Sequence, residues 1–184
     1  MRGFERTDLW FSLCGLNCGL CPMLLGGHCG GCGNGNQSCR IARCSLEQPE
    51  RVEYCYQCGK FPCEKYGEMD EFDIFITRKN QMADLKRARK LGPAAYRREQ
   101  EERRGILDRL LAQYNDGRRK TLYCLGVNLL PLKRLRDIME RLEADPALAG
   151  ASPKEKANSS AALFQTAAEE CKIELKLRKR PDHT

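Results

Sequence analysis

Twelve cysteines in a chain of 184 residues are the side chains with the clearest chemistry in this sequence. Two of them, Cys124 and Cys171, stand alone, and we expect both to be small buried apolar residues. The other ten cluster in the N-terminal part, at Cys14, Cys18, Cys21, Cys29, Cys32, Cys39, Cys44, Cys55, Cys58 and Cys63. Cysteines at this density form disulfides in secreted proteins or hold metal ions as thiolates in a reducing compartment.

The opening residues favour the metal interpretation. Glu5 and Asp8 interrupt the basic start, and Asn17 falls inside 9–25, the only apolar stretch that a secretion signal could use. Apolar runs elsewhere are broken by polar residues and the mean hydropathy is −0.60, which argues against a membrane span. We therefore expect a cytoplasmic protein, with no membrane partner, whose clustered cysteines bind metal.

Zinc prefers four tetrahedral ligands, and a Cys-x-x-Cys turn supplies two of them from one tight loop. Three such pairs occur here, Cys18–Cys21, Cys29–Cys32 and Cys55–Cys58. Gly33 and Gly59 follow two of the pairs, and we expect them to take positive φ so that backbone N–H groups point at the thiolates. The ten clustered cysteines therefore predict about two structural zinc ions.

The spacing does not decide which cysteines share a metal. One scheme makes a local site of Cys29, Cys32, Cys39 and Cys44. A second site would then join Cys18 and Cys21 to Cys55 and Cys58, as in a zinc ribbon, and would leave Cys14 and Cys63 over. Interleaved schemes fit equally well. His28 is a further ligand candidate, although a polar loop residue explains it as simply.

Iron is the alternative metal, because all-cysteine ligation also serves iron–sulfur clusters. The Cys14, Cys18 and Cys21 spacing also occurs in radical S-adenosylmethionine enzymes, where three thiolates hold a 4Fe–4S cluster. Leu20 replaces the aromatic residue expected there, and no series of strand–helix units follows. A 4Fe–4S cluster used for electron transfer therefore stays open as the alternative cofactor.

The cysteine motifs also carry a family resemblance. The runs CGLNCGLCP (14–22), CGGC (29–32), CRIARC (39–44) and YCYQCGKFPCEK (54–65) resemble the cysteine-rich family known as domain of unknown function 3795 in order and spacing. After residue 76 the similarity is looser and rests on a helical tail with an apolar YCLGVNLLP segment. That family has no established activity, so the resemblance implies a metal-binding module and no reaction.

The elements that must position these cysteines differ between two parts of the chain. Residues 1–76 have a net charge of −3 and residues 77–184 one of +10. The first part is too rich in glycine for long helices, so we expect loops with helical turns near 40–47 and 64–68. Apolar periodicity predicts helices over 79–90, 93–116 and 132–142, and a capping box at Ser152 opens another that runs to about Cys171.

Two segments complete the predicted organisation. Residues 121–130 form an apolar run that fits a helix or a strand, and 173–177 alternate as an edge strand does. We therefore expect a cysteine-rich module (1–76), a helical region (77–150), and a helix with an edge strand and a basic tail (151–184). The predicted fold class is α-rich, with a small irregular α+β module of zinc-ribbon or knuckle type and metal-stabilised loops.

No catalytic set emerges outside the cysteines, since the chain has two histidines and no phosphate-binding loop. Clusters such as Arg97–Arg98 and Arg103–Arg104 suggest nucleic acid, but interleaved Glu99, Glu101 and Glu102 favour ion pairs along a helix. The predicted function is a structural zinc protein with a binding or regulatory role toward a macromolecular partner. An iron–sulfur redox protein is the alternative.

Overall fold

The computed structural model describes residues 1–34, 37–69 and 71–180. The part of the chain that it describes is helix-rich, as predicted, with seven α-helices and several short 3-10 helices. Its one β-interaction is an isolated antiparallel bridge between Phe11 and Asn17. Among the described helices, none is both long and apolar enough to cross a membrane.

The chain divides into two compact units, at positions that the change in charge does not mark. The first comprises Met1–Gln100 with the C-terminal segment from Leu177, and the second comprises Glu101–Lys176. The sequence placed its first boundary at residue 76 instead. Residues beyond that position belong to the first unit because Leu85, Ala88 and Tyr96 are buried in its apolar core. The net charge of a segment describes its surface, whereas its membership of a compact unit depends on which side chains are buried together.

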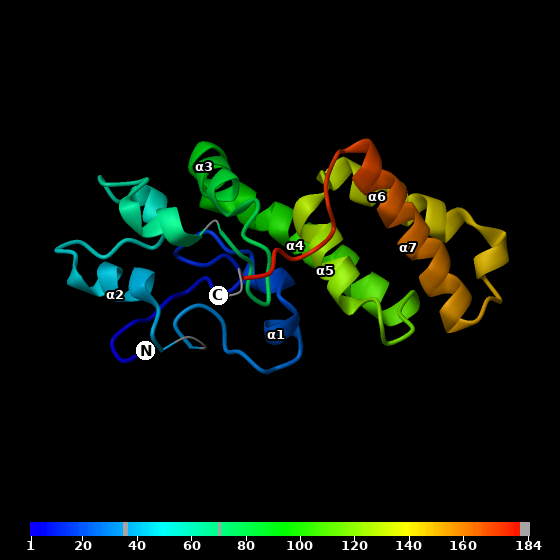
Figure 1. Ribbon diagram of the computed structural model, residues 1–184, viewed down its shortest axis with the longest axis horizontal. Coiled ribbons are helices and arrows are strands. Elements are labelled where there is room, and N and C mark those ends of the chain that lie inside the picture. The colour runs from blue at the N-terminus through cyan, green and yellow to red at the C-terminus, as the bar shows by residue number, and fades with distance from the viewer. Residues whose placement is uncertain (35–36, 70, 181–184) are drawn as a thin grey trace. The chain divides into compact units, whose positions relative to one another are not determined.

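Short helices separated by long loops make up most of the first unit (Figure 1). Its 3-10 helices are η1 (Cys18–Leu20), η2 (Cys55–Gln57) and η3 (Glu64–Met69), and its α-helices are α1 (Pro22–Leu25), α2 (Arg40–Glu47) and α3 (Gln81–Leu91). The helical turns predicted near 40–47 and 64–68 are thus confirmed. The helix predicted over 79–90 is α3, which ends where Gly92 takes a φ of +82°.

Aromatic rings form the centre of the first unit's core. The ring of Phe11 lies 4.5 Å from that of Tyr96 and 5.5 Å from that of Tyr54, centroid to centroid. Tyr54 in turn stacks on Tyr56 at 5.2 Å. These contacts join the segment before the first cysteine, the segment before Cys55 and the start of α4 (Pro93–Gln113). Aliphatic side chains such as Leu13, Ile41 and Leu85 pack with these rings in the same core.

Longer helices build the second unit, into which α4 continues (Figure 1). They are α5 (Lys120–Leu129), α6 (Leu132–Ala144) and α7 (Pro153–Glu170), with a 3-10 turn, η4, at Pro146–Leu148. The ambiguous run 121–130 is therefore a helix. The predicted capping box is present at the start of α7, where the Glu155 carboxylate accepts the Ser152 N–H at 2.8 Å.

Close packing of α5 against α7 explains the buried side chains of this unit. Phe164 is fully buried and its ring lies over Gly126, where a Cβ atom would collide with it. Tyr123, also fully buried, lies 5.5 Å from the Phe164 ring. Cys124 is buried on α5, as expected of a small apolar residue, whereas Cys171, which follows α7, is partly exposed.

The edge strand predicted over 173–177 is wrong. An edge strand needs a neighbouring strand for its backbone hydrogen bonds, and the described residues contain no sheet. Residues 173–177 form no strand, and Arg178, which follows them, contacts the loop that contains Asp73. Asp73 N–H donates to the Arg178 carbonyl at 3.0 Å, and the Arg178 N–H and guanidinium donate to the Asp73 carboxylate, both at 2.9 Å.

The docked Asp73 carboxylate is held in its charged form. Burial alone would raise its pKa, but hydrogen bonds from the Arg178 guanidinium, the Arg178 N–H and the Arg78 N–H outweigh burial and lower it below the usual 3.8. Because the folded pKa is depressed, the ionised carboxylate stabilises this contact at neutral pH. That contribution is lost as the pH falls through the lowered value.

We expect Asp73→Asn to release the C-terminal segment at pH 7. Losing charge-assisted hydrogen bonds should weaken its docking by about 2 kcal/mol, seen as faster hydrogen exchange over residues 177–180. Asp108→Asn is the control, because that carboxylate forms an exposed pair with Arg104 at 2.8 Å and should change nothing beyond about 0.5 kcal/mol. Unchanged exchange in the Asp73 variant would contradict the proposed anchor.

Candidate metal centre

The ten clustered cysteines line two separate cavities, both within the first unit. A larger cavity of about 810 Å³ is lined by six of them, Cys14, Cys18, Cys21, Cys29, Cys32 and Cys39. A smaller cavity of about 40 Å³ is lined by the other four, Cys44, Cys55, Cys58 and Cys63. We call these the six-cysteine cavity and the four-cysteine cavity. Every cysteine predicted as a metal ligand lies in one of them, and all twelve are free thiols.

This grouping differs from the scheme that spacing suggested. Cys44 joins Cys55 and Cys58 rather than Cys29 and Cys32. Helix α2 is the reason, because Cys39 is its N-cap and Cys44 lies within it. Five residues on a helix turn the side chain by about 140° around the axis, so the two thiols point to different sides. Cys39 remains with the six, where its Sγ also accepts the N–H of Ala42 at 3.5 Å.

Two of the Cys-x-x-Cys segments fold in the same way. The 3-10 helix η1 begins at Cys18 and η2 begins at Cys55, and in each the N–H of the second cysteine donates to the carbonyl of the first at 3.0 Å. Each tight turn brings two thiols to one side of the chain. Local backbone hydrogen bonds therefore position four of the ten clustered thiols, independently of any distant contact.

The glycines after the pairs fulfil the prediction only in part. Gly33 has a φ of +85°, as expected, and the Phe4 ring occupies the space where its side chain would lie. Gly59 does not take positive φ. The turn after Cys58 closes without it, because the Phe61 N–H donates to the Cys58 carbonyl at 3.0 Å.

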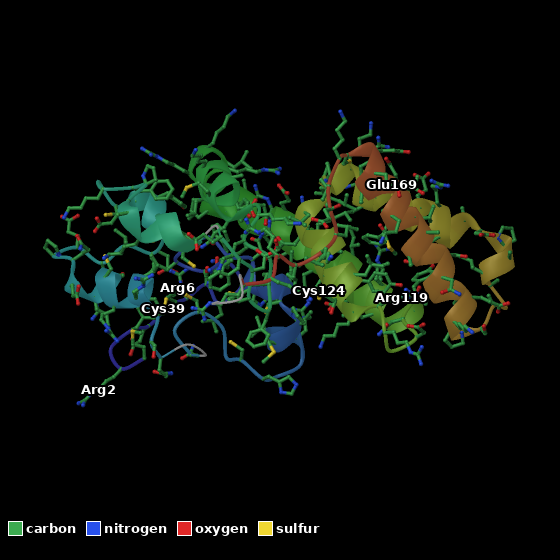
Figure 2. The ribbon with its side chains drawn as sticks, viewed as in Figure 1. Arg2, Arg6, Cys39, Arg119, Cys124 and Glu169 are labelled. Atoms are coloured by element: carbon green, nitrogen blue, oxygen red, sulfur yellow. The ribbon has the colours of Figure 1, made fainter. Side chains whose placement is uncertain are left out.

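Arg6 ties the beginning of the cysteine-rich stretch to its later part. Its side chain is only 2% exposed and donates to the carbonyls of Glu53, Phe11 (2.9 Å) and Asp8 (3.2 Å). The guanidinium also lies 5.1 Å from the centre of the Tyr54 ring. In Figure 2 Arg2 extends away from the ribbon, whereas Arg6 lies among the loops. Contacts to the nearby residues 8–11 and to the distant residues 53–54 make Arg6 a polar anchor of this unit.

Asp8 continues the same network. Its carboxylate accepts the Tyr54 hydroxyl at 2.8 Å and the N–H groups of Trp10 and Phe11 at 3.0 Å each. Arg97 on α4 approaches it at 3.5 Å. Burial and the hydrogen bond to this carboxylate raise the pKa of Tyr54, so its hydroxyl is a donor at neutral pH.

Asn17 orients the first cysteine motif against the helices. Its amide donates to the Asp84 carboxylate on α3 at 2.8 Å and accepts the Tyr96 hydroxyl of α4 at 3.0 Å. The residue is 4% exposed. Because Asn17 directly precedes Cys18, these two bonds fix where η1 starts.

The cysteine-rich loops also contact each other directly. The Cys55 N–H donates to the Leu13 carbonyl at 2.9 Å, which brings the 54–65 motif beside the start of the 14–22 motif. Around Cys14, Ser12 Oγ lies 3.2 Å from Sγ, and the Gln81 amide donates to the Cys14 carbonyl at 2.8 Å. Both cavities thus share a framework of backbone hydrogen bonds.

Burial keeps the thiols of Cys18, Cys32 and Cys55 protonated in the absence of a positive charge. It raises the pKa of Cys32 to about 11 and that of Cys55 to about 12. The pKa of Cys18 is raised well above 9.0, first by burial and then by the neighbouring cysteines. Several thiolates crowded together repel one another, so only a cation can stabilise all of them in the deprotonated form.

The sulfur donors of the two cavities meet the chemical requirement of some metals and not the geometric one. Four or more sulfur donors per cavity suit zinc or iron, both of which accept all-thiolate ligation. Within the described ranges, however, no three His, Cys, Asp or Glu side chains converge at metal-ligand geometry. His28, the alternative ligand, is exposed and lines the six-cysteine cavity. The chemistry of the donors therefore fits a metal, and the thiols gather without forming a closed site.

Comparisons with protein-family models, with curated proteins and with solved structures give no match. The resemblance of residues 14–65 to the cysteine-rich family therefore stays a prediction. The site rests on the geometry of this chain alone.

Several residues that shape the site were missed by sequence reasoning, namely Arg6, Asn17 and Gln81. The signal for Asn17 was its place as the only polar residue between Cys14 and Cys18. Arg6 and Gln81 had no comparable signal, since one looks like part of a charged start and the other like a polar helix residue. Their roles depend on partners more than forty residues away, such as Glu53 for Arg6 and Cys14 for Gln81.

We expect Arg6→Met to lower the free energy of unfolding by about 3 kcal/mol, because it leaves buried carbonyls without donors. Urea unfolding of protein with its metal content matched to wild type would measure this. Arg2→Met is the matched control, since Arg2 is exposed on the same segment, and Arg6→Lys should recover part of the loss. Equal stabilities for the Arg2 and Arg6 variants would rule out the anchoring role.

Proposed function

We propose that this protein is a cytoplasmic zinc-binding protein whose ten clustered cysteines hold about two zinc ions, one in each cavity. The observation that carries the proposal is the separation of these cysteines into two cavities lined by six and by four of them. Random placement of buried thiols would not assemble ligands from segments so distant in the chain. The resemblance of residues 14–65 to a cysteine-rich family is in keeping with such a module.

The four-cysteine cavity matches the requirement of a structural zinc ion most closely. It offers four thiols, the number that tetrahedral zinc takes. Ile41, Val52, Phe61 and Tyr66 also line it, so part of its wall is apolar. Its volume of about 40 Å³ leaves no room for a substrate beside an ion. A site of this kind stabilises a fold and performs no reaction.

A structural role of the bound zinc would also explain how the loops of the first unit are held in place. Between α1 and α3, most of the chain is irregular or in short helical turns. Loops of this kind lose much conformational entropy on folding and bury little apolar surface in return. Metal–thiolate bonds offset that loss, because the free energy of binding becomes free energy of folding. A zinc-ribbon or knuckle-like arrangement of this unit is part of the proposal.

The six-cysteine cavity supports a second candidate, an iron–sulfur redox protein. Six thiols are more than one zinc ion uses, and the volume of about 810 Å³ is far larger than an ion needs. A 4Fe–4S cluster, if bound here, would supply one-electron transfer. Burial raises the pKa of Cys14, and the hydrogen bond with Ser12 and the Arg78 guanidinium offset this only in part, so this thiol also needs a bound cation to ionise.

A binding or regulatory role toward a macromolecular partner completes the proposal, with protein favoured over nucleic acid. The basic clusters of the sequence are largely engaged within the fold. Arg103 is buried and donates to the carbonyls of Val127 (2.6 Å) and Leu130 (2.9 Å). Arg104 pairs with Asp108 at 2.8 Å. Groups held in this way contribute little to phosphate binding.

The division of the thiols between two cavities predicts which pairs of cysteine substitutions have additive effects on the number of bound zinc ions. Cys44→Ser and Cys58→Ser should each remove one zinc ion, and the double variant should lose the same single ion. Combining Cys44→Ser with Cys29→Ser should remove both ions. Native mass spectrometry of protein purified without air would count the metal, with Cys171→Ser as a control outside both cavities. Additive loss for the Cys44 and Cys58 pair would contradict the four-cysteine site.

The choice between zinc and iron has its own readout. We expect anaerobically purified protein to contain zinc and to show no visible absorption band, because Zn²⁺ has a filled d shell. Iron with inorganic sulfide and a broad visible band that bleaches on reduction would favour the redox function. Protein free of both metals, with its thiols still reduced, would remove both candidates.

A further inference from the structure

Gln81 leaves one buried polar atom unsatisfied in the wall of the six-cysteine cavity. The residue is 2% exposed, and its amide Nε2 donates to the Cys14 carbonyl at 2.8 Å. A carbonyl only accepts hydrogen bonds, so this contact fixes the amide orientation and turns Oε1 the other way. Oε1 is buried and has no hydrogen-bond partner in the described part of the chain. A buried acceptor without a donor is costly, which points to a group that supplies one.

The same cavity has an apolar wall that the thiols do not explain. Phe72, Ile74, Phe75 and Ile76 line it from one loop. Ile74 is 42% exposed and Phe75 is 63% exposed, which is unusual for large apolar side chains. Metal ligation does not use such residues, whereas a small organic molecule gains affinity from them. The volume of about 810 Å³ is in the range of small-molecule sites.

Apart from the cysteines, charge in the lining favours an anion. Three arginines contribute, Arg40, Arg78 and Arg180, against one carboxylate, Glu71. The Arg78 and Arg180 guanidinium groups lie 5.5 Å and 5.3 Å from the centre of the Phe72 ring. Two cations held on one aromatic ring at the apolar wall place positive charge beside the surface that would hold an organic body.

We propose that the six-cysteine cavity binds a small organic anion. Its apolar, preferably aromatic, body packs against Phe72, Ile74 and Phe75. Its acidic group faces the arginines, and an N–H or O–H group donates to Gln81 Oε1. This inference goes beyond the metal-binding function, and none of its three proposed contacts uses a thiol.

A fluorescent probe with these three features tests the proposal on the full chain. 8-Anilinonaphthalene-1-sulfonate carries an aromatic body, a sulfonate and an anilino N–H. We expect saturable binding of about one probe per chain to protein whose metal content is measured on the same sample. Gln81→Met should weaken binding about tenfold, because it removes the acceptor at similar volume. Naphthalene-1-sulfonate lacks the N–H, so its affinity should not respond to Gln81→Met.

Two exposed positions keep the test valid if Gln81→Met disturbs folding. Phe75→Ser should weaken probe binding about fivefold and Arg180→Gln about threefold, since each removes one proposed contact. Leu91→Ser and Arg118→Gln change an exposed apolar residue and an exposed arginine outside the cavity, and neither should alter binding.

The outcomes separate this proposal from the metal function. Metal present with no saturable probe binding overturns the ligand site and leaves the zinc proposal standing. Metal absent, with probe binding that still responds to Gln81, Phe75 and Arg180, supports the ligand site alone. Probe fluorescence that rises in the variants, or that is indifferent to Phe75 and Arg180, reflects an exposed core and overturns the proposal.

Discussion

The first unit depends on one buried cation. Arg6 donates to backbone carbonyls of Glu53 and Phe11, so a single guanidinium joins the segment before the first cysteine to the segment before Cys55. Asp8 and Tyr54 complete this polar centre with a hydrogen bond of 2.8 Å. Buried charges are retained only when their hydrogen bonds are satisfied. The arrangement therefore has one well-paired geometry, and that geometry brings the two groups of cysteines side by side.

Helix α2 then separates the thiols into two environments. Its N-cap, Cys39, belongs to the six-cysteine cavity, while Cys44 within it belongs to the four-cysteine cavity. One cavity is small and partly lined by apolar residues. The other is roomy and includes arginines, a buried unsatisfied amide and exposed aromatic surface. A single chain thus combines a site suited to holding a fold with a site that has space for chemistry or for a ligand.

Local patterns predicted the helices well because their signals act over a few residues. The Ser152–Glu155 capping box lies where the sequence placed it, and α3 ends at Gly92, between the helices predicted over 79–90 and 93–116. The edge strand over 173–177 failed for the opposite reason, since alternation creates a strand only where another strand offers partners. The same limit applies to the compact units, whose boundary follows the burial of Leu85 and Tyr96 rather than the change in charge.

The sequence by itself located the ten clustered thiols on which the proposed metal binding rests, and η1 and η2 form their turns from local bonds. Only the tertiary structure decided which thiols meet, since Cys44 and Cys55 are brought together by packing that no short pattern encodes. It alone also revealed the buried Gln81 acceptor beside an apolar loop. The spacing of cysteines specifies which thiols one turn can present, whereas burial and hydrogen bonding decide which distant segments come together.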